Sequence, residues 1–158
     1  MLVRPLTTQE RAEMPGYTHV AIVTADDLTQ VTAAAAQAIT LCALKKGDII
    51  LRAIGDPVDP FRNTADAAFN SDTVSLGDSG SATRHLAATE ANLNGTYLKV
   101  IGNTAFLYTA VDSLILTVNS MAGKSLVNIN RGEYHAFFAL CRSSFVSNAI
   151  ARKGIAKP

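Results

Sequence analysis

The stretch EYHAFFAL, Glu133 to Leu140, carries the clearest structural signal in this 158-residue chain. Its side chains alternate, and a period of two places every second residue on the same face of a β-strand. One face then carries Tyr134, Ala136, Phe138 and Leu140, and the other carries His135, Phe137, Ala139 and Cys141. The stretch SLILTVNS repeats the pattern, with Leu114, Leu116 and Val118 on one face. Both stretches predict strands that bury one face.

Similar short runs fill the chain from Tyr17 onward, and residues that favour turns separate them. Ala38 to Leu44 leads through the turn Lys45–Asp48 into Ile49–Ile54, which predicts a hairpin. Pro57 and Pro60 cannot donate to a ladder, so their segment is predicted at a sheet edge or in a loop. About eight short strands with this spacing predict an all-β fold, either an antiparallel sandwich or a barrel.

Three parts of the chain differ in composition. Residues 1–16 are mostly polar and end in the breaker pair Pro15-Gly16, which predicts an extended N-terminal arm with one or two helical turns. Such a short helix needs a partner surface to hold it. Residues 17–142 form the predicted sandwich domain, and residues 143–158 form a C-terminal tail that ends with basic residues.

The charge and hydropathy of the chain restrict its partners. Lys and Arg number 14 against 13 Asp and Glu, so the net charge of +1 gives no general attraction to nucleic acid. Only 17% of residues are charged, and the mean hydropathy is +0.18, which favours an oligomer with buried interfaces. We find no secretory signal and no apolar run long enough to span a membrane, so synthesis in a cytoplasm is expected.

The two cysteines, Cys42 and Cys141, lie far apart in the sequence and lack the paired spacing of zinc ligands. A disulfide between them is conceivable, but we expect free thiols that are mostly buried and that pack as small apolar groups.

Gly77-Asp78-Ser79-Gly80 matches the tetrapeptide around the nucleophile of trypsin-like proteases. A serine nucleophile needs a histidine base and a carboxylate that orients it, and His19, His85, His135, Asp48 and Asp56 are the candidates. The chain is too short for the two barrels of that fold, which need about 200 residues. We therefore interpret the motif as a turn that ends a strand, with glycines at positive φ and Asp78 bonded to local amides.

Three further motifs have plain structural interpretations. Gly123-Lys124-Ser125 imitates the end of a phosphate-binding loop but lacks its first glycine, so a hairpin turn is expected. Asn94-Gly95-Thr96 fits a glycosylation sequon and also predicts a turn. Several carboxylates with no calcium-loop spacing are interpreted as a solvated acidic loop: Asp56, Asp59, Asp66, Asp72 and Asp78. The sequence thus predicts no catalytic residue, no cofactor and no metal site.

The region from Ala25 to Leu140 resembles small virion proteins of tailed bacteriophages, and the likeness rests on a succession of motifs. These are Asp27-Leu28-Thr29, the Ala-rich run Ala33–Leu41, Lys46-Gly47-Asp48, Asp66–Asn70, Gly77–Gly80 and Gly132-Glu133. The resemblance implies a β-sandwich, often of jelly-roll type, that attaches as a multimer to the phage head as a decoration or cement protein, or that is built into a fibre. We therefore expect an antiparallel β-sandwich that resembles a jelly roll. It also implies that Gly77–Gly80 is a strand-terminal turn.

The sequence-based hypothesis is therefore a non-enzymatic virion protein on the capsid surface, which decorates or cements the head. Its expected partners are the major capsid protein and copies of itself, in a homotrimer clamped by the arm or the tail. A head-fibre or tail component that binds a receptor is the alternative, and a hydrolase built on Ser79 is a distant third.

Overall fold

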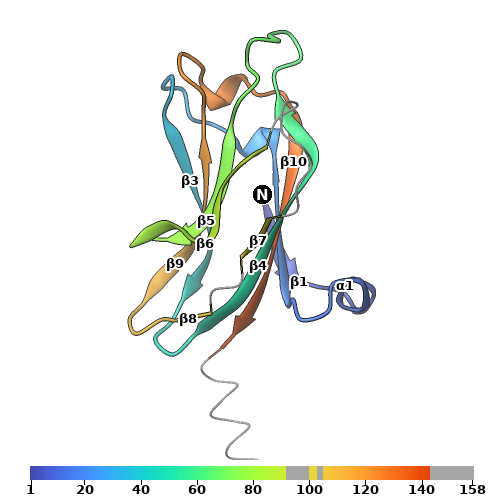
Figure 1. Cartoon of the computed structure of the whole chain (residues 1–158), viewed down its shortest axis with the longest axis vertical. Helices are drawn as coiled ribbons and strands as arrows, with labels where there is room; N and C mark the ends of the chain where they lie inside the picture. The colour runs from blue at the N-terminus through green and yellow to red at the C-terminus, as the bar shows by residue number, and fades with distance from the viewer. Residues whose placement is uncertain (92–99, 103–104, 143–158) are drawn as a thin grey trace, which may run out of the picture.

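The computed structural model describes residues 1–91, 100–102 and 105–142, which form two antiparallel β-sheets packed face to face (Figure 1). Sheet A has the strand order β1-β2-β10-β4-β7, with β8 also paired to β4. Its strands are β1 (Leu2–Pro5), β2 (His19–Thr24), β10 (Arg131–Cys141), β4 (Ile49–Arg62), β7 (Val100–Gly102) and β8 (Phe106–Leu107). Sheet B has the order β3-β9-β5-β6. Its strands are β3 (Ala36–Leu44), β9 (Asp112–Asn119), β5 (Thr73–Asp78) and β6 (Ser81–Glu90). The predicted antiparallel β-sandwich is confirmed.

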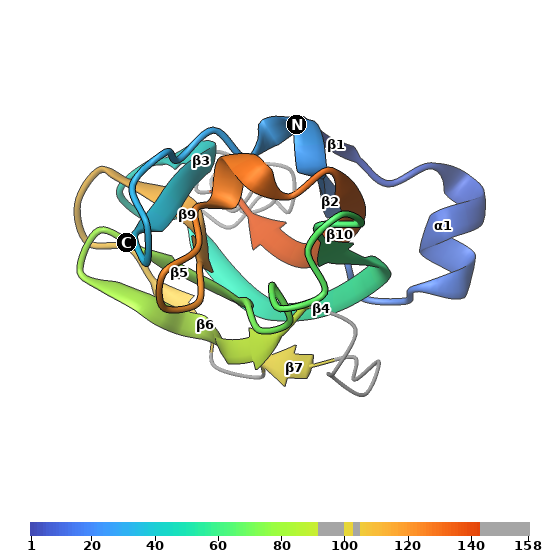
Figure 2. The same ribbon diagram turned by 90° about the horizontal axis from the view of Figure 1, so that it is seen from above.

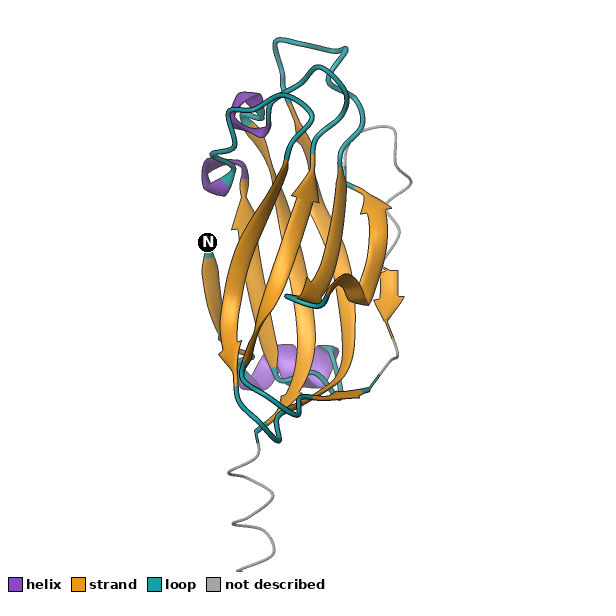
Figure 3. Cartoon of the chain, turned by 90° about the vertical axis from the view of Figure 1, so that its left-hand side faces the viewer, coloured by secondary structure: helices purple, strands orange, loops and turns teal. Residues whose placement is uncertain are grey.

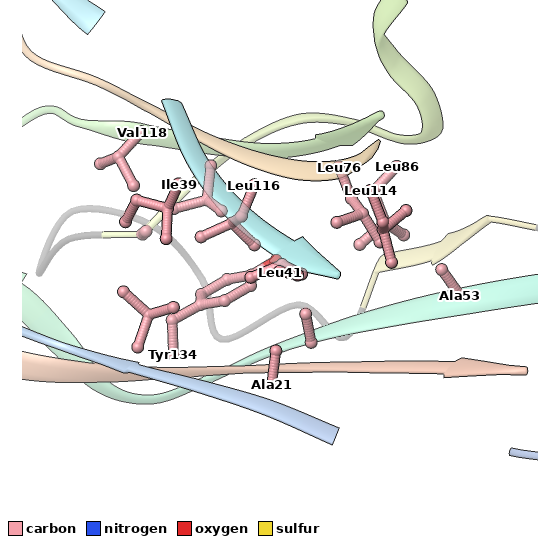
Figure 4. Packing of buried hydrophobic residues seen from close by; sticks show 14 of the residues in the cluster. Ala21, Ile39, Leu41, Ala53, Leu76, Leu86, Leu114, Leu116, Val118 and Tyr134 are labelled. Carbon is pink, nitrogen blue, oxygen red and sulfur yellow. The ribbon is translucent and has the colours of Figure 1, made fainter. Parts of the chain in front are cut away.

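The core lies between the sheets and follows the alternation of the sequence. From sheet B, Leu114, Leu116 and Val118 of β9 are fully buried, and the inner face of β10 supplies Tyr134, Ala136, Phe138 and Leu140 from sheet A. Figure 4 shows Tyr134 reaching from sheet A toward the leucines of sheet B. Each large apolar side chain buried in this way contributes roughly 1.5–3 kcal/mol to folding. The predicted inward faces of both strands are confirmed.

One glycine makes room for the largest of these core side chains. A Cβ atom added to Gly55 of β4 would lie 1.9 Å from the hydroxyl oxygen of Tyr134 and 2.9 Å from its ring carbon Cζ. Tyr134 is only 3% exposed and therefore has little space to move. Gly55 is thus required by the close approach of the Tyr134 ring.

The predicted hairpin between β3 and β4 is wrong. The turn at Lys45–Asp48 carries the chain from sheet B to sheet A, where β4 pairs with β10. Leu44 and Ile50, on either side of the turn, are both fully buried in the core between the sheets. The Asp48 carboxylate accepts the Lys45 N–H at 3.0 Å and so fixes this corner. Turn residues alone do not distinguish a hairpin from a corner between sheets.

The connection after β9 also crosses between the sheets. Gly123 has a positive φ of +74°, so the predicted turn at residues 122–124 is confirmed. It does not close a hairpin, because β9 lies in sheet B and the following β10 in sheet A. The segment after the turn contains η2 (Leu126–Asn128), a 3₁₀ turn, in place of the second strand that the expected hairpin would need. Leu126 is fully buried there and anchors the crossing.

The prolines of β4 lie at an edge, as one of the two alternatives predicted. On the side away from β10, the described ladders of β4 end at Gly55, where β7 pairs. Pro57 and Pro60 follow this point, in a part of β4 whose pairing with β10 contains register shifts. Prolines are tolerated there because the pairing with β7 has ended and the pairing with β10 is irregular.

The N-terminal segment is attached to sheet A of the same chain. Strand β1 pairs with β2 at four positions, from Leu2 opposite Ile22 to Pro5 opposite His19. The predicted short helix is confirmed as α1 (Thr8–Glu13). It begins with a capping box between Thr7 and Glu10, and Glu10 also accepts two hydrogen bonds of 2.6 Å from Arg4. The domain boundary at residue 16 stays a prediction.

This segment covers part of the outer face of sheet A. Leu6, Val20, Ile54 and Ala139 are buried but do not belong to the cluster between the sheets. Alternation along β2, β4 and β10 turns the last three of these outward. A Cβ atom added to Gly16 would lie 3.2 Å from Arg52 of β4, so the segment reaches across the sheet (Figure 2). None of the residues of α1 itself is buried, so the helix is held by its capping box and by the bonds between Glu10 and Arg4 of β1.

Gly55→Ala should lower the free energy of unfolding by about 1–3 kcal/mol, because the added methyl group overlaps the Tyr134 hydroxyl. Urea unfolding of the single and double variants measures this effect. Tyr134→Phe removes the overlapping oxygen, so the cost of Gly55→Ala should be smaller in that background, with a coupling of about 0.5 kcal/mol or more. Equal costs in both backgrounds would contradict this account of Gly55.

Candidate functional site

The motif Gly77–Gly80 forms the turn between β5 and β6, as predicted. One carboxylate oxygen of Asp78 accepts the backbone N–H groups of Gly80 at 3.0 Å and of Ser81 at 2.9 Å. The expectation of positive φ at its glycines is wrong, because neither glycine has one among the positive-φ residues of the described chain. A Cβ atom on Gly77 would lie 1.9 Å from the Ser81 carbonyl oxygen. Close backbone approach therefore requires this glycine.

The second carboxylate oxygen of Asp78 is the centre of a buried polar network. It accepts a hydrogen bond from Nε of Arg84 and another, at 3.0 Å, from the hydroxyl of Tyr108. Burial by itself would raise the pKa of Asp78, but the hydrogen bonds from Arg84, Tyr108 and the Ser81 amide outweigh it and lower this pKa. Asp78 is therefore held as a carboxylate although it is only 4% exposed.

His85 completes the network. Its Nε2 lies 2.7 Å from the Tyr108 oxygen. Because the Tyr108 hydroxyl already donates to Asp78, it accepts from His85, which fixes the tautomer with the proton on Nε2. The other ring nitrogen, Nδ1, is buried and has no hydrogen-bond partner among the described residues. Burial lowers the pKa of His85 to about 4, and burial together with Asp78 raises the pKa of Tyr108.

The network joins the β5–β6 turn to the segment around β8. The guanidinium of Arg84 lies 4.0 Å from the centre of the Phe106 ring, in a cation–π contact, and Phe106 packs edge-on against Tyr108. A Cβ atom on Gly102 of β7 would lie 1.5 Å from the His85 carbonyl oxygen, so β6 and β7 are in close contact. This side of the sandwich is thus closed by packing and by a charged, hydrogen-bonded cluster.

The structure does not assemble the catalytic triad weighed from the sequence. Ser79 is exposed, and its amide donates to the carboxylate of Asp112 at 3.3 Å. The three histidines make other contacts. His85 bonds to Tyr108, His19 stacks on Phe138, and His135 pairs with Glu133. Asp48, directly before β4, accepts a hydrogen bond from Arg142. Asp56 of β4 lies opposite His135 in the ladder with β10.

The remaining predicted motifs serve the fold wherever the structure describes them. Lys124 forms an ion pair with Asp66, which ties the turn after β9 to the loop before β5. Asp59 pairs with Arg131 and Asp78 with Arg84. The interpretation as a solvated acidic loop is wrong for Asp72 and Asp78, which are both buried. No three His, Cys, Asp or Glu residues within the described ranges are grouped so as to hold a metal ion. Asn94-Gly95-Thr96 and the tail 143–158 lie outside the described residues.

The thiols are free, as predicted, but they are less buried than predicted. Cys42 lies in sheet B and Cys141 in sheet A, and both are half-buried. Cys42 packs against the core, and burial raises the pKa of its thiol. None of the described helices is long and apolar enough to cross a membrane.

Comparisons with known proteins identify a shared fold. Neither the family models nor the curated proteins include a match. A chain in the structure of the cyanophage Pam1 capsid asymmetric unit superposes with a TM-score of 0.53 at 24% identity, over 77% of this chain and 80% of that one. A chain in the acid-stable capsid structure of Helicobacter pylori bacteriophage KHP30 gives a TM-score of 0.48 at 12% identity, over 88% and 91% of the two chains. The similarity to the Pam1 chain shows that the two chains share a fold, and it shows nothing beyond the fold.

The buried network predicts that acid destabilises the protein. Between pH 6.5 and about 4 the unfolded chain binds a proton on His85 and the folded chain does not, so the free energy of unfolding falls as the pH is lowered through this window. The loss attributable to His85 should approach about 3 kcal/mol at pH 4. His85→Gln, which keeps a donor for Tyr108 but does not titrate, should flatten the profile in urea unfolding. An unchanged slope in this variant would refute the assignment.

Proposed function

We propose that this protein is a non-enzymatic structural component of a phage virion, which decorates or cements the capsid surface. The observation that carries the proposal is the fold it shares with a chain of the cyanophage Pam1 capsid asymmetric unit. The succession of motifs from Ala25 to Leu140 points independently to virion proteins of tailed phages. The polar network around Asp78 supports a structural role, because its members bind one another.

The strand order supports a jelly roll, an architecture used by viral capsid domains. When the eight strands β2–β7, β9 and β10 are counted in chain order, sheet A contains the first, eighth, third and sixth. Sheet B contains the second, seventh, fourth and fifth. A jelly roll distributes its strands between two sheets in this order. We therefore extend the proposal to the fold, with β1 as an addition at the edge.

The N-terminal segment is the proposed attachment device. Strand β1 is four residues long, lies at the edge of sheet A and pairs only with β2 in the described structure. Met1 and Leu2 are each 51% exposed. The same four-residue ladder can form on β2 of a neighbouring copy, as in domain swapping, or β1 can extend into the shell. We propose that these contacts hold a homotrimer on the major capsid protein, and that several arms bound together multiply the affinity.

Purified protein should bind capsids that lack it and raise the temperature at which they disrupt. Deleting residues 1–5 should keep the β-sheet circular dichroism spectrum, because the core between the sheets remains. Capsid binding should weaken by about tenfold or more, equivalent to about 1.4 kcal/mol. Sedimentation of capsids with the bound protein measures this.

Ser79→Ala is the matched control, because Ser79 lies exposed in the β5–β6 turn, and this variant should bind capsids as the native chain does. Failure of the full chain to bind would count against the virion role. Full binding by the truncated chain would count only against the arm.

A further inference from the structure

The free edges of the two sheets differ in how they are protected. An edge strand presents unpaired N–H and C=O groups, and proteins usually guard it with charges, proline, short length or a covering segment. Strand β1 is four residues long and contains Arg4 and Pro5. Strand β7 is three residues long and lies against β6, which itself contains Arg84. The edges formed by β1, β7 and β6 are therefore guarded.

Strand β3, the outermost strand of sheet B, lacks these guards along most of its length. Its nine residues, AQAITLCAL, include no charged residue and no proline. Only its end is protected, because the ladder with β9 is irregular between Thr40 and Cys42 and Arg142 donates to the Ala43 carbonyl at 3.0 Å. Figure 3 shows the long strands of the sandwich running side by side along the molecule.

The run Ala36–Thr40 is the open part of this edge. It pairs with β9 in uninterrupted register, so it is a regular strand. Ala36, Ala38 and Thr40 are exposed and small. Among the described residues outside the sheet, only Gln30 bonds to the backbone of this run, through a long 3.5 Å contact to the Ala36 carbonyl. The Gln37 side chain, which alternates to the inner face, bonds to the backbone of Asp27, Thr29 and Gln30. Among the described residues, the backbone edge of the run is therefore open to another strand.

We propose that Ala36–Thr40 pairs antiparallel with the same run of a second copy, across a two-fold axis at Ala38. The two copies of sheet B then form one continuous sheet. This register places Ala38 opposite Ala38 and Ala36 opposite Thr40, so only small side chains meet on the exposed face of the seam. On the inner face, Gln37 of each copy lies opposite Ile39 of the other.

Charge favours this occupant and this direction. Lys45 and Lys46 follow the strand directly, and antiparallel pairing places the lysines of the two copies at opposite ends of the seam. Parallel pairing would bring all four together. An uncharged run offers no electrostatic preference for a different partner, whereas an identical strand matches it in length and side-chain size. This contact does not depend on a virion role, and in a capsid it would link one trimer to the next.

The test uses two variants of the full chain, Ala38→Lys and Ala38→Glu. Like charges directly opposite each other destabilise a pair of strands, so each variant alone should self-associate at least about tenfold more weakly than the native chain. An equimolar mixture should restore association, because the ammonium group introduced in one variant then lies opposite the carboxylate introduced in the other. Sedimentation velocity over a range of concentrations and native mass spectrometry of the mixture measure this.

Ala88→Lys is the matched control, because Ala88 is an exposed alanine on β6, the opposite edge strand of sheet B. It should associate as the native chain does. The proposal is overturned if the native chain does not self-associate. It is equally overturned if the native chain self-associates and Ala38→Lys leaves that association unchanged. It is also overturned if both variants lose association and mixing fails to restore it. In that case this edge of one copy would bind a different surface of the next copy, and not the same edge.

Discussion

The structure depends on the burial of two facing rows of apolar side chains between the sheets. Leu114, Leu116 and Val118 of β9 meet the inner face of β10, where Tyr134 and Phe138 are the largest residues. Interior packing at this density leaves almost no free volume, so the backbone adapts to the side chains. Gly55 is the clearest example, because it leaves room for the ring of Tyr134. The same packing determines which faces and edges of the sheets remain for partners.

Alternation in the sequence was sufficient to predict β9 and β10 and the grouping of their side chains on two faces, because a period of two is a local property. It could not predict how strands are assigned to sheets. The turn at Lys45–Asp48 has the composition of a hairpin turn, but it is a corner between the two sheets. Leu44 enters the core from sheet B and Ile50 enters it from sheet A. The sequence also did not predict that the N-terminal segment pairs with β2. Its four-residue ladder with β2 is a long-range pairing that its polar composition does not reveal.

The polar network was predictable only in part. Asp78 and its bonds to local amides follow from turn chemistry within four residues. Tyr108, thirty residues away from Asp78, and the buried ring of His85 join it only through the approach of β6 to the segment around β8. His85 was one of the histidines weighed as a base for Ser79, and in the structure its ring bonds to Tyr108. The result is a cluster that closes one side of the sandwich and leaves β3 as the open edge.

The central claim is that this sandwich is a building element of a virus particle, and its presence in particles tests that claim most directly. Quantitative mass spectrometry of virus particles purified from cells that produce the chain gives its copy number relative to the major shell protein. The account predicts a copy number comparable with that of the shell protein, retained after extensive washing. Absence from the particles, with the protein found only in infected cells, would contradict it.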